Sequence, residues 1–222
     1  MKMLKGKIYL IAAIGTDVGK TFLVTNLCKN LRRKKVKVKA LKPVASGFRD
    51  SGESDSGKIL TALGLTIHKK NLDAISPWRF KAAISPNFAA GLEKKKIVFS
   101  EVKKFCLEEI TRSKKSNEFL FIESSGGAAT PISDEKNFLD LAVELKIPVL
   151  LLTSNYLGSI SHTICAITAL KAKKIAIEKI IVNENFTGEK SSGVSQKEFT
   201  QLIKNLSKIE TVLLNDFLKK VS

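Results

Sequence analysis

The sequence contains few of the residues that hold stapled or metal-bound folds together. It has three cysteines and two histidines among 222 residues. Cys28, Cys106 and Cys165 lie far apart and form no CxxC pair, which argues against a disulfide scaffold and a zinc ribbon. Cys28 and Cys165 fall in predicted helices, where we expect them to pack in the core. This cysteine usage favours a reducing compartment, so we expect a cytoplasmic protein.

Long apolar runs are also missing. A membrane-spanning helix needs roughly 20 apolar residues, and the run at residues 8–14 is much shorter. Lysines precede this run, as they do in a signal peptide, but no small-residue cleavage site follows it. We therefore expect neither a signal peptide nor a membrane partner.

Acidic residues are scarce relative to basic ones. The chain has 21 Asp and Glu against 38 Lys and Arg, for a net charge of +17. Only five of the basic residues are arginines, and the lysines are spread along the whole chain. Because nucleic-acid surfaces favour the arginine fork, we interpret the charge as a solvated lysine-rich surface and expect no nucleic-acid partner. The excess charge would also attract anionic substrates.

Short β-branched and aliphatic runs alternate with helical stretches along the chain. This alternation predicts an α/β fold, a doubly wound and mostly parallel sheet with helices on both faces, as in P-loop NTPases, in a single domain over residues 1–222. The predicted strands are Ile8–Ala13, Val36–Leu41, Phe119–Glu123, Val149–Thr153, Lys179–Asn183 and Thr211–Leu214. The predicted helices are Lys20–Lys34, Asp55–Leu63, Val102–Thr111, Lys136–Leu145, Ile160–Ala172 and Gln196–Leu206.

A glycine loop joins the first predicted strand to the first predicted helix. It ends in Gly19-Lys20-Thr21, and its first glycine, Gly15, stands one place later than in the GxxxxGK[ST] pattern. In this context backbone N–H groups and the helix dipole bind phosphates, Lys20 neutralises them and the Thr21 hydroxyl binds Mg²⁺. The alternative is a glycine turn with a chance Gly-Lys-Thr, which the position after the first strand disfavours.

Two carboxylates and one lysine are expected near this loop. Glu123 ends a predicted strand, and Asp55 begins a predicted helix, where it would otherwise serve only as a cap. Lys42 follows the second predicted strand and precedes a Pro and a Ser-Gly turn. Carboxyl ends of parallel strands meet at one edge of a sheet. Lys42 is therefore either directed at the phosphate site or one of many surface lysines.

Separate segments of the chain resemble the dethiobiotin synthetase family. They are the loop at residues 15–21, Lys-Pro-Val-Ala-Ser-Gly at 42–47, Glu-Ser-Ser-Gly-Gly at 123–127 with Thr-Pro after it, and Leu-Gly-Ser-Ile-Ser-His at 157–162. The resemblance implies a cyclo-ligase that uses ATP and Mg²⁺. One amine of 7,8-diaminononanoate captures CO₂ as a carbamate, the carbamate attacks the γ-phosphate, and the second amine closes the cyclic urea of dethiobiotin.

The resemblance also implies a role for each matching residue. Lys42 and Lys20 would be catalytic, and Thr21, Asp55 and Glu123 would bind Mg²⁺. The nucleotide would be bound by Asp17, Val18, Gly19, Lys20, Thr21, Phe22, Asp55, Glu123, Ser124, Ser125, Gly126, Asn183 and Glu184, with Asn183 reading adenine. The substrate would contact Ser46, Gly158, Ser159, Ile160 and Ser161. In the family the last four serve the site across a dimer interface, so we expect a homodimer.

Two further features depart from the family pattern. Asn87 stands where family members often have histidine, and the proline-bearing adenine loop is missing after about residue 186.

Other interpretations use the same loop. A partitioning ATPase with a deviant Walker motif, binding DNA or a membrane, would carry a signature lysine where this chain has Gly15. A cobyrinate-type amidotransferase would need a second, glutaminase domain, for which the chain is too short. An inactive P-loop fold would not be expected to keep Lys20, Thr21, Lys42 and Glu123.

Overall fold

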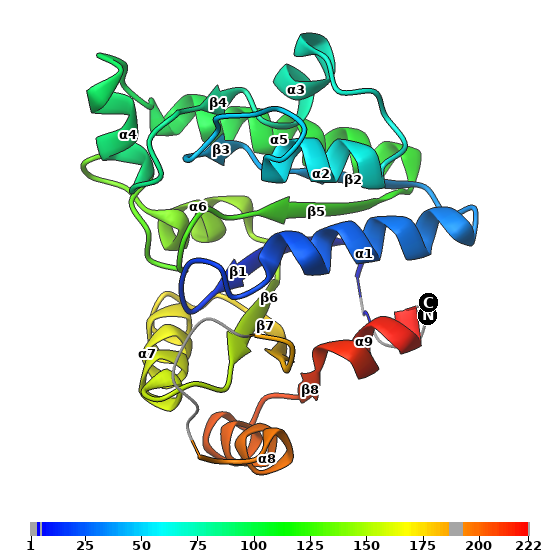
Figure 1. Ribbon diagram of the computed structural model, residues 1–222, viewed down its shortest axis with the longest axis vertical. Helices are drawn as coiled ribbons and strands as arrows, with labels where there is room; N and C mark the ends of the chain where they lie inside the picture. Colours follow the sequence, from blue (N-terminus) through cyan, green and yellow to red (C-terminus); the bar gives the residue numbers. More distant parts are fainter. Residues whose placement is uncertain (1–3, 5, 187–192, 222) are drawn as a thin grey trace.

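The computed structural model describes residues 4, 6–186 and 193–221. A six-stranded parallel sheet runs through the molecule in the order β2-β5-β1-β6-β7-β8 (Figure 1). The strands are β1 Ile8–Ala13, β2 Val38–Leu41, β5 Phe119–Glu123, β6 Val149–Ser154, β7 Ile177–Asn183 and β8 Thr211–Leu213. Two short strands, β3 Val44–Ala45 and β4 Trp78–Arg79, pair separately.

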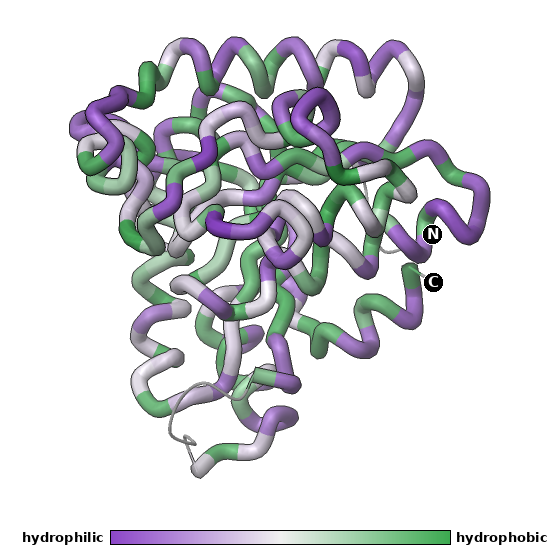
Figure 2. Tube along the Cα trace, turned by 45° about the horizontal axis from the view of Figure 1, so that its top comes forward, coloured by the Kyte–Doolittle hydropathy of each residue, from purple (hydrophilic) through white to green (hydrophobic). Residues whose placement is uncertain are grey.

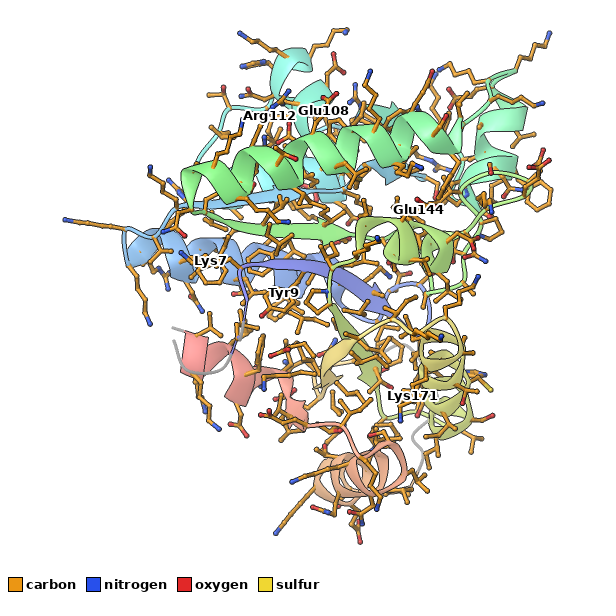
Figure 3. All side chains as sticks on the ribbon, turned by 180° about the vertical axis from the view of Figure 1, so that it is seen from behind. Lys7, Tyr9, Glu108, Arg112, Glu144 and Lys171 are labelled. Atoms are coloured by element: carbon orange, nitrogen blue, oxygen red, sulfur yellow. The ribbon has the colours of Figure 1, made fainter. Side chains whose placement is uncertain are left out.

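Helices pack on both faces of this sheet. They are α1 Lys20–Arg33, α2 Asp55–Ala62, α3 Lys69–Ile75, α4 Pro86–Leu92, α5 Phe99–Ser116, α6 Phe138–Leu145, α7 Ser159–Ala172, α8 Gln196–Ser207 and α9 Leu214–Val221. Helix α1 contacts α2 and α9 on one face. On the opposite face, seen from behind in Figure 3, α5 contacts α6 and α7 contacts α8. The predicted doubly wound α/β fold is confirmed.

The core follows from the apolar strands. Every residue of β5 and β6 is buried, as expected for strands covered on both faces. The hydropathy tube shows this as green strands inside a molecule whose helices alternate between green and purple (Figure 2). Within the described part of the chain, no helix combines the length and apolarity that crossing a bilayer requires.

The main difference from the predicted elements is that the structure contains additional helices and strands. Helices α3, α4 and α9 and strands β3 and β4 were not predicted, and α5 begins three residues earlier and ends five later than expected. Cys28 is buried as expected, but the expectation for Cys165 is wrong because its side chain is exposed on α7. A residue within a helix is buried only if its face meets a neighbour, which a local pattern does not reveal.

Sheet order brings the predicted site residues to one edge. Strand β5 lies between β1 and β2, with Ile11 in register with Glu123 and Leu41 with Ile122. The loop after β1, the end of β5 and the residue after β2 are therefore neighbours in space. Parallel α/β sheets bind their ligands at this carboxyl edge.

Candidate active site

The loop between β1 and α1 takes a conformation that requires glycine at its last position. Gly19 has a φ of 107°, in the left-handed region that L side chains rarely adopt. A Cβ on Gly19 would also lie 2.6 Å from Nδ2 of Asn183. Gly19 thus leads the chain into α1, whose first N–H groups have no side-chain cap and remain available for an anion.

Lys20 folds back over this loop. Its Nζ donates to the carbonyl oxygens of Gly15, at 3.0 Å, and Gly126, at 2.7 Å. Burial is the main reason that the pKa of Lys20 falls to about 8; the Glu123 charge opposes the shift and the Lys42 charge adds to it. The ammonium therefore bridges the phosphate loop and the loop after β5, where it would contact a bound phosphate oxygen.

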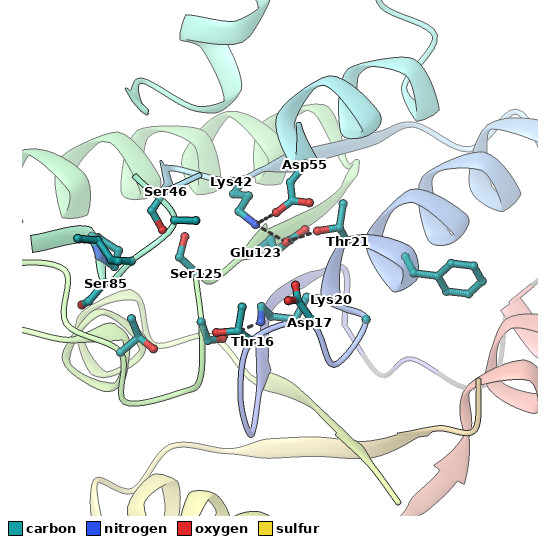
Figure 4. Close-up of a pocket in the computed structure, with 17 residues that line it drawn as sticks. Thr16, Asp17, Lys20, Thr21, Lys42, Ser46, Asp55, Ser85, Glu123 and Ser125 are labelled. Carbon is teal, nitrogen blue, oxygen red and sulfur yellow. Dashed lines mark hydrogen bonds and ion pairs between the residues drawn. The ribbon is translucent and has the colours of Figure 1, made fainter. Parts of the chain in front are cut away.

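A second cluster surrounds the Lys42 ammonium (Figure 4). Lys42 Nζ donates to Glu123 Oε1 at 2.8 Å and to Asp55 Oδ2. The Thr21 hydroxyl donates to the same Glu123 oxygen at 2.6 Å. Residues from α1, the end of β2, the start of α2 and the end of β5 thus converge on one point. The alternative of Lys42 as an ordinary surface lysine is excluded, since only 5% of this residue is exposed.

Charge pairing sets the ionisation of this cluster. Burial alone would lower the pKa of Lys42, but the charges of Glu123 and Asp55 outweigh it, so the pKa is raised. Burial is the largest single influence on the pKa of Asp55 and would raise it. The charge and hydrogen bond of Lys42, with smaller contributions from Thr21 and Lys58, together outweigh it, so the pKa is lowered. At neutral pH Lys42 is therefore a cation, with the ionised Asp55 carboxylate beside it.

A cavity of about 580 Å³ opens over both clusters. It brings together most of the residues that sequence and resemblance had suggested. Those that line it are Asp17, Gly19, Lys20, Thr21, Phe22, Lys42, Ser46, Asp55, Glu123, Ser125 and Gly126. Its wall also includes residues that sequence reasoning had not selected, notably Thr16, Ala83 and Ile84. Thr16 lies within the glycine loop that the sequence singled out. Nothing in the local sequence marks Ala83 and Ile84; only the approach of the segment before α4 places them there.

Other expected nucleotide residues do not line the cavity. Val18 and Ser124 are buried behind it. Asn183 lies behind the phosphate loop, where its Nδ2 donates to the Val18 carbonyl at 2.9 Å and its Oδ1 accepts from the Asn185 N–H. Glu184 accepts the backbone N–H groups of residues 214 and 215, both at 3.0 Å, at the start of α9. Contact of either side chain with adenine stays a prediction.

The predicted substrate loop lies apart from this cavity. Gly158, with a φ of 95°, is the residue before α7, and Ser159 and Ile160 begin that helix. Ser161 is exposed. None of the four residues from Gly158 to Ser161 lines the cavity over Lys42.

Asn87, which replaces the family's frequent histidine, connects two segments beside the cavity. Its Oδ1 accepts from the Ser85 hydroxyl at 2.7 Å, and its Nδ2 donates to Asp134 at 3.2 Å. Ser85 itself lines the cavity, so Asn87 supports the wall through a neighbour.

The donors around Lys42 fit Mg²⁺. Carboxylate and hydroxyl oxygens are the hard ligands that this ion prefers. Glu123 is fully buried, and its Oε2 has no hydrogen-bond partner within the described residues, which leaves an acceptor free for a cation. Thr21, Asp55 and Glu123 are the residues that would hold the ion.

Comparisons with known proteins show which family the chain belongs to. A family model described as an AAA domain matches residues 7–213. The ATP-dependent dethiobiotin synthetase of Acidiphilium cryptum is 37% identical over 79% of this chain and 78% of its own length. The synthetase of Phenylobacterium zucineum is 35% identical over 87% and 82%, and that of Aquifex aeolicus is 34% identical over 90% and 85%.

Solved structures with the same architecture include a ParA family ATPase and a cell division protein. A ParA family ATPase from Chlorobium tepidum has a TM-score of 0.53 at 16% identity, covering 93% of this chain and 82% of its own. MinD from Aquifex aeolicus has a TM-score of 0.52 at 16% identity, over 98% and 88%. At this identity the likeness shows a P-loop NTPase fold alone. Sequence identity over most of both chains decides the family: the chain belongs to the dethiobiotin synthetases.

Proposed function

We propose that this chain is an ATP-dependent dethiobiotin synthetase. It takes up 7,8-diaminononanoate and CO₂, consumes ATP with Mg²⁺, and forms dethiobiotin, ADP and phosphate in biotin biosynthesis. The observation that carries the proposal is the placement of the Lys42 ammonium beside Glu123, facing the phosphate loop in one cavity. The family membership supports it, and no curated relative named above is a partitioning ATPase.

The reaction requires the protein mainly to supply positive charge near the phosphates and to orient the substrates. A carbamate that attacks a phosphate brings two anions together, and nearby cations reduce their repulsion. Lys20 and Lys42 both line the cavity and are such cations. Bound Mg²⁺ would supply further positive charge at the phosphates. No nucleophilic side chain is required, because the amines of the substrate form the new bonds, and orientation then dominates the rate.

The remaining site residues are proposed by position. Ser46 and Ser85 line the cavity beyond Lys42 and offer hydroxyls to the diamine. The side-chain amide of Asn183 already donates one N–H to the phosphate loop, and its second N–H would donate to adenine. The backbone N–H groups from Asp17 to Phe22 would bind the phosphates.

We further propose that the chain acts as one domain in a homodimer in the cytoplasm. Helix α7 is apolar over much of its surface, yet Ile160, Ile164 and Ala166 are only partly buried and Cys165 is exposed. A second copy would cover this face. Its residues Gly158 to Ser161 would then lie beside the carboxylate of the substrate bound by the first copy. The N–H groups of Ile160 and Ser161 would be offered to that carboxylate, since the N–H of Ser159 already donates to the Tyr156 carbonyl.

One assay tests the activity. The purified protein is given the diamine, labelled bicarbonate and Mg·ATP. Label in an acid-stable ureido product, with ATP turnover that depends on the diamine, supports the proposal. ATP turnover that is indifferent to the diamine contradicts it.

A further inference from the structure

Lys42 occupies the point on which the proposed metal ligands converge. Its Nζ donates to Glu123 Oε1 at 2.8 Å and to Asp55 Oδ2, and the Thr21 hydroxyl reaches the same Glu123 oxygen at 2.6 Å. Figure 4 shows dashed lines from the Lys42 ammonium to both carboxylates and from the Thr21 hydroxyl to Glu123. One oxygen of each carboxylate that would hold Mg²⁺ is therefore already paired with a cation of the protein itself, while Glu123 Oε2 has no partner among the described residues.

Burial makes this pairing necessary when no ligand is bound. Glu123 is fully buried and Lys42 is 5% exposed, and a buried carboxylate without a cation is strongly unfavourable. The other ammonium of the cavity does not take this role. Lys20 donates to the backbone carbonyls of Gly15 and Gly126. Lys42 is thus the counter-charge of Glu123 among the described residues.

A lysine is suited to a temporary role of this kind. Its charge sits at the end of a flexible four-carbon stem, so the ammonium can move while the backbone stays fixed. The backbone of Lys42 is held, because its N–H donates to the Ile75 carbonyl at 3.0 Å. The cavity that the phosphate loop lines lies next to the ammonium, so the ammonium has space into which it can move.

We propose that Lys42 is a removable counter-cation that keeps divalent metal off Thr21, Asp55 and Glu123 until a nucleotide arrives. This rests on the proposed function, in which a triphosphate enters the same cavity. The phosphates then attract the ammonium, and the freed carboxylates accept the metal that accompanies them. The same side chain is thereby delivered to the place where the phosphoryl group is transferred.

The consequence is a metal site that is weak in the protein alone. Mn²⁺, which prefers the same oxygen donors as Mg²⁺, would compete with the ammonium for Glu123 and Asp55. Removing the ammonium while keeping an apolar stem, in Lys42→Met, leaves both carboxylates uncompensated. Because the ammonium contacts both carboxylates, we expect Mn²⁺ to bind this variant at least about tenfold more tightly than the wild type.

The test measures Mn²⁺ binding without nucleotide or diamine, from the electron paramagnetic resonance signal of the free ion. The matched control is Lys20→Met, which removes a charge from the same cavity but leaves Lys42 on the carboxylates. A gain in Lys42→Met several times larger than in Lys20→Met supports the proposal. Equal gains in both variants would mean a general field effect and would overturn it, as would tight Mn²⁺ binding by the wild type.

A second set of variants guards against misfolding. Circular dichroism checks that Lys42→Met is folded, and Lys42→Arg, which keeps a cation, is expected to bind Mn²⁺ as weakly as the wild type. Adding Glu123→Gln to Lys42→Met should abolish the gain; a gain that persists overturns the assignment. Failure here is separable from failure of the proposed function, because ureido product formed by the wild-type protein is measured independently of nucleotide-free metal binding.

Discussion

Lys20 titrates in an accessible range because the fold buries its ammonium. Its pKa is about 8 in the ligand-free protein, against an ordinary value of 10.5. Above pH 8 the neutral form therefore dominates before phosphate binds. We predict that Mg·ATP affinity falls above this pH by up to about tenfold per unit. Direct binding measurements without the diamine, across pH 7 to 10, check this.

The matched variant for this prediction is Lys20→Arg, whose guanidinium stays charged throughout that range. In this variant the affinity for Mg·ATP should no longer fall at alkaline pH. An unchanged fall would assign the titration to another group.

The lowered pKa of Lys20 also changes how the free energy of unfolding depends on pH. Between about pH 8 and 10.5 the unfolded chain binds more protons at this residue, so its contribution to stability rises with pH there.

Lys42 is expected to separate catalysis from nucleotide binding. In Lys42→Ala the phosphate loop and Lys20 remain. The lost attraction between the ammonium and the phosphates is offset by metal ligands that no longer have to be freed from it, so affinity for Mg·ATP should change little. Formation of the ureido product should fall about a hundred- to a thousandfold, the typical loss when one preorganised charge partner of a transition state is removed. Isothermal titration for ATP and a product assay measure the two quantities. Equal losses in both would make Lys42 a nucleotide ligand or a structural residue.

At the scale of single elements, Glu184 connects β7 to α9. Its carboxylate accepts the N–H groups of residues 214 and 215 at the start of that helix. Glu184→Ala removes this cap, and we predict a loss of about 1–2 kcal/mol in the free energy of unfolding. Urea denaturation measures it.

The neighbouring Asn185→Ala serves as the control. Its contact with Asn215, at 3.3 Å, is exposed, so its loss should cost less than about 0.5 kcal/mol. A Glu184→Ala variant that keeps its stability but binds ATP more weakly would instead favour the nucleotide contact that the family resemblance implies.

Elements differ in how well the sequence predicts them. Strands β1 and β5 begin and end at the predicted residues, because each is a short apolar run, which in β5 is closed by Glu123. Helix α9 was missed because its residues follow a strand directly and no capping side chain of its own marks its start. That cap comes from Glu184, which lies 30 residues earlier in the chain.

At the scale of the whole molecule, the proposed dimer predicts sharing of active sites. Lys42→Ala disables the cavity, and Ser161→Asp places a negative charge where the substrate carboxylate would bind, at an exposed position that tolerates it. Each variant alone should be inactive. A mixed dimer, co-purified on two different tags, has one intact cavity facing one intact loop and should recover about half of the wild-type activity per dimer.

The contrary result is equally informative. If residues 158–161 served the cavity of their own chain, the mixed dimer would hold no intact site and stay inactive. Sedimentation of the wild-type chain as a monomer at assay concentrations would contradict the dimer itself. Cys165, which is exposed in the single chain, offers a further readout, since a covering partner would slow its reaction with a thiol reagent.

The amino-acid sequence by itself determined the alternation of strands and helices, the phosphate loop and the family, because these depend on residues close together in the chain. Only the tertiary structure decided that Lys42 lies against Asp55 and Glu123, 13 and 81 residues away, and that Cys165 is exposed. Such contacts arise from strand order and helix packing, which join distant segments and leave no mark in any local pattern.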